Sequence, residues 1–186
     1  MCIRDSAVDT ELRWLIITSL AAAGAVHEAG IAAEHDRDAT DIGARRAAAA
    51  RAARPTAEGK SDAWALLTGD RAPSLAMRRA VVHGFHQSDQ EALLEPFIGR
   101  YAEVLDTLWN GRGIEESLLL TSGLFPQAVV SPAVLEMADG VLSRDVPAPA
   151  RRLVSEARDQ TARALRARAA DVAGPAQLSS DGGRWA

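Results

Sequence analysis

The stretch LLEPFIGRYAEVLDTL, residues 93–108, decides the fold. Its apolar side chains recur three and four residues apart, which places them on one face of an α-helix and predicts that this face is buried. We therefore expect Leu94 and Phe97 in the interior. Pro96 falls in the first two turns of the predicted helix, where a proline produces at most a modest bend. The preceding residues SDQE, 88–91, have the Ser-x-x-Glu form of a capping box.

Helical spacing continues on both sides of this stretch, and no segment alternates between apolar and polar residues as a strand does. A first helix carries an apolar stripe and is ended by Gly24; the stripe consists of Leu12, Leu15, Ile16 and Leu20. Further helices are expected at about 26–37, 40–54, 56–67, 74–86, 115–125, from 131 and from about 151. Thr56 is expected to cap one of them.

Successive helices joined by short turns predict an all-α fold. We expect an irregular HEAT-like or armadillo-like stack of antiparallel helix pairs, an α-solenoid, in which each pair covers the apolar face of its neighbour. The chain shows no strict sequence repeat, so a compact helical bundle is the alternative. Abundant alanine and only 4% aromatic residues suit closely packed helices better than a sheet.

Composition limits the classes of function. The 186 residues are 47% hydrophobic and 25% charged, as in one globular domain, and the formal net charge is −4. An acidic chain predicts neither nucleic acid nor an anionic membrane as its partner. The sequence has no apolar run long enough to span a membrane and no signal-peptide pattern, so the cytoplasm is the expected location.

The chain is expected to consist of three parts: a non-native start, a helical domain and a disordered tail. Residues 1–6, MCIRDS, join no periodic pattern and are interpreted as a non-native scar. Residues 7–172 form the predicted helical domain, and residues 173–186 are expected to be a disordered tail. The one cysteine, Cys2, lies in the first part and cannot form an internal disulfide.

No catalytic or metal-binding residue is predicted from motifs. The segment VHEAGI, 26–31, begins like the zinc-binding HExxH motif, but Ile31 occupies the position of the second histidine. The next histidine, His35, lies roughly 12 Å further along a helix than His27. His83 and His86 are three residues apart, with only Glu91 near enough in the sequence to be a third ligand.

Two other patterns are better explained by ordinary structural roles. Ser117, Thr121 and Ser122 have no histidine and acid at a suggestive spacing, so they are interpreted as helix residues. The last predicted helix carries Arg152, Arg163 and Arg166 on the side opposite its apolar face, with Arg151 and Arg158 beside them. Because Asp159 interrupts this side, a solvated or partner-facing surface is favoured over a nucleic-acid site.

Three longer patterns carry a family resemblance. They are DATDIG at 38–43, ARPTAEGKSDAW at 53–64, and GFHQSDQEALLEPFIGRY at 84–101. Because these three patterns occur in this order and at this spacing, the chain from about residue 10 to 170 resembles the C-terminal helical domain of bacterial aminopeptidase N. That enzyme is in the gluzincin family of zinc metalloaminopeptidases.

The resemblance implies a role outside the catalytic centre. In that family an upstream catalytic domain carries HExxH and a distant Glu as zinc ligands, a GxMEN loop and an oxyanion-stabilising Tyr, and none of these motifs occurs here. No cofactor is expected in this chain; zinc is expected in the upstream domain. The chain is expected to close over that domain as a non-catalytic cap, to enclose a cavity for peptide substrates and to limit access to it.

Candidate side chains for that cavity are few. Arg78 and Arg79, which could attract the C-terminal carboxylate of a peptide, are the candidates, with salt bridges between neighbouring helices as the alternative. The alternative function is a stand-alone helical-repeat scaffold that binds a protein partner. The sequence upstream of Ala7 in the source genome discriminates between them, since only an aminopeptidase would show HExxH there.

Overall fold

The computed structural model describes residues 9–69 and 73–178, with side chains up to Val172. In these residues every regular element is a helix, so the prediction of an all-α fold is confirmed. The helices are α1 (Thr10–Ala22), α2 (Glu28–Arg37), α3 (Asp41–Ala53), α4 (Ala57–Thr68), α5 (Leu75–Phe85), α6 (Glu91–Leu94), α7 (Phe97–Trp109), α8 (Ile114–Gly123), α9 (Pro132–Leu142) and α10 (Ala148–Leu178).

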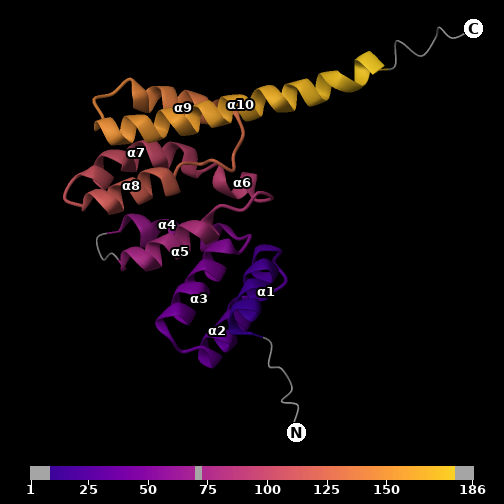
Figure 1. Cartoon of the computed structure of the whole chain (residues 1–186), viewed down its shortest axis with the longest axis vertical. Coiled ribbons are helices and arrows are strands. Elements are labelled where there is room, and N and C mark those ends of the chain that lie inside the picture. The colour runs from indigo at the N-terminus through magenta and orange to yellow at the C-terminus, as the bar shows by residue number, and fades with distance from the viewer. Residues whose placement is uncertain (1–8, 70–72, 179–186) are drawn as a thin grey trace, which may run out of the picture.

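The helices lie in successive layers. Figure 1 shows α1, α2 and α3 at one end, then α4 with α5, α7 with α8, and α9 with α10 at the other end. The most extensive contact between elements joins α3 to α5. Whether the layers follow the repeat geometry of HEAT or armadillo proteins stays a prediction. None of the described helices is both long enough and apolar enough to cross a lipid bilayer.

Side-chain caps set the start of three helices. The hydroxyl oxygens of Thr40, Thr56 and Ser74 accept hydrogen bonds from the backbone N–H groups three residues later. These bonds satisfy donors that have no partner inside the helix. The predicted cap at Thr56 is therefore confirmed. Gly24, which follows the C-cap residue Ala23 of α1, has a φ of 74°. Glycine adopts this φ without steric cost, and the helix ends here as expected.

The stretch that decides the fold forms two helices, so the prediction of one long helix was wrong. The four-residue α6 is separated from α7 by Glu95 and Pro96. Proline has no N–H for the Ala92 carbonyl, and its ring clashes with that carbonyl in a continuous helix. The predicted capping box at Ser88 is also wrong, because α6 starts with Gln90 in the N-cap position and without a side-chain cap.

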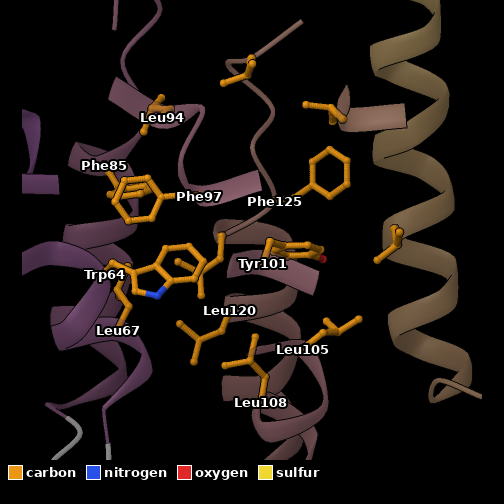
Figure 2. Close-up of a cluster of buried hydrophobic side chains, with 14 of the residues drawn as sticks. Trp64, Leu67, Phe85, Leu94, Phe97, Tyr101, Leu105, Leu108, Leu120 and Phe125 are labelled. Carbon is orange, nitrogen blue, oxygen red and sulfur yellow. The ribbon is translucent and has the colours of Figure 1, made fainter. Parts of the chain in front are cut away.

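The expected burial of the α6–α7 face is confirmed. Leu94 is 1% and Phe97 is 4% exposed, and both belong to the larger of two apolar clusters, which runs from α3 to α10. The Phe97 ring lies 5.0 Å from that of Trp64 and 5.2 Å from that of Phe85, centroid to centroid (Figure 2). A smaller cluster at the α1 end contains Trp14, Ala21, Ile31, Ala47 and Ala50.

Two further observations concern the first and the last described helix. The apolar stripe of α1 faces outward, because Trp14 and Ala21 occupy the buried side of that helix. At the other end of the chain, α10 continues to Leu178, six residues into the segment 173–186 for which a disordered tail was predicted. Residues 1–6, interpreted as a scar, and 179–186 lie outside the described residues.

Candidate functional site

Arg78 lies inside the helix stack. Its side chain is fully buried, and its Nη1 donates a hydrogen bond of 2.8 Å to the carbonyl oxygen of Leu67. The same nitrogen lies 3.1 Å from Oε1 of Glu116, which also pairs with Arg112. Burial lowers the pKa of Arg78 below its usual value. This guanidinium therefore joins α4, α5 and α8, which is the alternative role considered for it.

Arg79, the next residue on α5, has a different environment. Its side chain is 58% exposed, and its Nη2 lies 2.6 Å from Oε1 of Glu115 at the start of α8. It lines an open groove of about 570 Å³ between α5, α8 and the segment that follows α8. The groove is lined by Arg79, Val82, His83, His86, Gln87, Leu119 and Gln127. Of the two expected arginines, the structure thus places only Arg79 at a groove.

The groove combines one cation with groups that form hydrogen bonds. His83 is exposed, as is Gln127, while Gln87 is half-buried and donates to the carbonyl oxygen of Gly84. The two glutamine side chains each carry an amide that can both donate and accept. A guanidinium beside amides and an imidazole is suited to binding a carboxylate or a peptide group.

His86 is a half-buried polar group of the groove. Its Nε2 lies 2.8 Å from the carbonyl oxygen of Gly123 and must be the donor, because a carbonyl only accepts. Burial lowers the pKa of His86, so the ring is neutral near pH 7 and its Nδ1 carries a lone pair. That Nδ1 is buried and has no partner among the described residues.

Most of this groove was missed at the level of sequence. The sequence presents His83 and His86 only as possible metal ligands, and no motif points to Gln87, Leu119 or Gln127. The signal in the sequence is the spacing of Arg79, Val82 and His83, which are three and one residues apart and so share one side of α5. His86 follows directly after the last residue of this helix. Gln127 comes from a distant segment, and its place could not be inferred from periodicity.

The remaining histidines do not converge. His27 precedes α2 and His35 lies near its end. Glu91, the ligand considered for His83 and His86, instead pairs with Arg168 at 2.7 Å. In the described part of the chain, no three or more His, Cys, Asp or Glu side chains are grouped so that they could hold a metal ion. These residues thus do not fit a zinc site.

The hydroxyl groups and arginines discussed above have structural partners or face solvent. Ser117 Oγ donates to the Leu108 carbonyl oxygen at 2.7 Å, and Thr121 Oγ1 accepts from Nε1 of Trp109 at 2.9 Å. On α10, Arg158 pairs with Asp139 of α9. Exposed arginines on the same helix include Arg152, Arg163 and Arg166.

Comparisons with known proteins agree with the predicted resemblance. Residues 3–163 match the family described as the ERAP1-like C-terminal domain. The chain is 46% identical over 173 residues to Aminopeptidase N of Streptomyces lividans, an alignment that covers 92% of this chain and 20% of that protein. The chain thus spans about a fifth of the length of this curated relative. It belongs to the ERAP1-like C-terminal domain family.

Proposed function

We propose that this chain is the non-catalytic C-terminal part of a zinc-dependent aminopeptidase and acts in the removal of N-terminal residues from peptides. The observation that carries the proposal is the 46% identity to Aminopeptidase N across 92% of the chain. In this proposal the zinc and the catalytic residues belong to an upstream domain, which is what the similarity to Aminopeptidase N supports. The location of this enzyme is the cytoplasm.

In this proposal the chain encloses the peptide cavity and limits access to it, and the groove beside Arg79 forms part of the cavity wall. Arg79 attracts the C-terminal carboxylate of a bound peptide, and its pairing with Glu115 keeps the exposed guanidinium in place. Arg78 does not contact the peptide, since its side chain is buried. It holds α5 against α4 and α8, and so it positions the face that carries Arg79.

The first test is the reading frame upstream of Ala7 in the source genome. We expect it to encode an HExxH motif several hundred residues earlier, within one longer polypeptide. An upstream stop codon, or a long upstream region without a zinc motif, would favour the alternative of a stand-alone scaffold that binds a protein partner.

The second test uses that longer polypeptide with the substitution Arg79→Ala. We expect KM for peptides with a free C-terminal carboxylate to rise about two- to five-fold, the effect of one exposed ion pair, while the same peptides as C-terminal amides are unaffected. The matched control is Arg152→Ala, which removes an arginine of α10 whose side chain is 69% exposed. Equal effects on acids and amides would contradict the role of Arg79 without touching the assignment to an aminopeptidase.

A further inference from the structure

The first helix of the described chain carries an apolar stripe that no other described element covers. Leu12 is 47% exposed, Leu15 62%, Ile16 46% and Leu20 40%. The four positions are three, one and four residues apart, so they form one continuous side of α1. The free energy of leaving four large apolar side chains in water is unfavourable.

The orientation of α1 is fixed by contacts on its other side. Trp14 is 1% exposed, and its Nε1 donates to Oδ2 of Asp38 at 2.8 Å. One turn away, Ile17 packs against the smaller apolar cluster. Arg13 Nε lies 2.7 Å from Oε1 of Glu34, whose carboxylate is buried. Rotating α1 to bury the stripe would break the indole bond and this ion pair.

The stripe is unusual within this molecule. Of the eight large hydrophobic side chains exposed in the described residues, four lie on the thirteen residues of α1. The other four are single residues on separate helices: Ile42, Leu66, Ile114 and Val172. Scattered apolar side chains are ordinary on protein surfaces, whereas contiguous ones mark contact sites. Moreover, α1 lies at one end of the stack (Figure 1), where stacked helical proteins need a polar outer face.

We propose that this α1 stripe is the docking surface for the folded part of the longer polypeptide that precedes it. The inference rests on the proposed function, in which this chain is one segment of an aminopeptidase. The chain spans about a fifth of its curated relative, so a large preceding part is available. Because α1 is the first described helix, the stripe is close in sequence to the part that precedes it. A tethered partner has a high effective concentration, so a surface of four apolar side chains is sufficient to hold it.

The test measures how fast a thiol at the stripe reacts with iodoacetamide. Leu15→Cys is made in the 186-residue chain, in the background Cys2→Ser, and in the longer polypeptide. Labelling is followed at the modified peptide by mass spectrometry. The matched control is Val172→Cys, which is 82% exposed on α10 at the opposite end of the stack. We expect both thiols to react at similar rates in the short chain, and Leu15→Cys alone to react at least ten-fold more slowly in the longer polypeptide.

Two results would overturn the inference. Equal reactivity of Leu15→Cys in the two polypeptides would show that nothing in the preceding part covers the stripe. Slow labelling of Leu15→Cys already in the short chain, which becomes slower as the protein concentration rises, would identify a second copy as the occupant. Aminopeptidase activity of the longer polypeptide is measured separately. A protected thiol at Leu15→Cys without activity would contradict the proposed function alone. Activity with an unprotected thiol would contradict the docking alone.

Discussion

Lys60 and Gln90 donate hydrogen bonds to neighbouring carbonyl groups at the end of α3. Nζ of Lys60 lies 2.8 Å from the oxygen of Ala52, and Nε2 of Gln90 lies 2.9 Å from the oxygen of Ala53. Each side chain also reaches a second helix end, since Lys60 donates to Phe85 and Gln90 to Ala22. Carbonyls at helix ends lack partners within the helix. These two side chains therefore join the ends of α1, α3 and α5.

Stability should depend on the protonation of Lys60. Its side chain is fully buried, and burial lowers its pKa from 10.5 to about 8. Between these values the unfolded chain binds more protons than the folded chain, so the free energy of unfolding should rise with pH across this window. The neutral amine keeps two hydrogens, enough for both carbonyl bonds. The gain should be on the order of 1 to 3 kcal/mol.

The measurement is urea unfolding of the wild type and of Lys60→Met at pH 7.5 and 9.5. Burial raises the pKa of Tyr101, which lowers stability at high pH in both proteins alike, so the difference between them isolates Lys60. A difference that stays constant with pH would show that Lys60 titrates as an ordinary surface lysine.

The close approach of α3 and α5 should make Gly84 irreplaceable. A Cβ atom at Gly84 would lie 2.1 Å from the carbonyl oxygen of Ala49, so backbone would have to move. Gly84→Ala should lower the free energy of unfolding by about 1 to 3 kcal/mol or more. Gly99→Ala, in α7, meets nothing within 4 Å and should instead stabilise by about 0.5 to 1 kcal/mol. Equal urea midpoints for the two variants would contradict the packing of α3 on α5.

Phe97 should be a major contributor to the larger apolar cluster. Phe97→Ala removes a ring that contacts Trp64 and Phe85, and it should cost about 3 to 5 kcal/mol by urea unfolding. Ile114→Ala is the control, because Ile114 is 61% exposed and its truncation should change stability by less than about 0.5 kcal/mol. A cost below about 1 kcal/mol for Phe97→Ala would mean that this face is not core.

The sequence predicts what depends on neighbouring residues and misses what depends on distant ones. Helical spacing and the cap at Thr56 are local, and both were predicted. The split at Pro96 is also local, but its effect was underestimated, since a modest bend was expected. By contrast, the partners of Lys60 and Gln90 lie 8 to 68 residues away, so their roles cannot be derived from periodicity.

The exposure of the candidate site residues also depends on distant parts of the chain. Arg78 and Arg79 are adjacent in the sequence, yet one is buried and the other exposed, because consecutive residues point about 100° apart on a helix. Which of them faces the groove depends on where α4 and α8 pack. The outward direction of the α1 stripe has the same origin: its apolar spacing predicts a covered face, but none of the described helices covers it.

The chain alone should neither retain zinc nor hydrolyse aminoacyl amides. A catalytic zinc needs three protein ligands and an open position for water. The whole chain has four histidines and one cysteine, and His86, the best placed, already donates through Nε2 to the Gly123 carbonyl. Two ligands at most, from His83 and His86, would not activate water at neutral pH.

Metal-stripped chain, given one equivalent of zinc and dialysed, should therefore contain no stoichiometric zinc and leave leucine p-nitroanilide intact. The longer polypeptide, treated identically, should retain the zinc and hydrolyse leucine p-nitroanilide. If the short chain instead kept zinc and showed chelator-sensitive turnover, and His83→Ala abolished both, the groove beside Arg79 would itself be an active site.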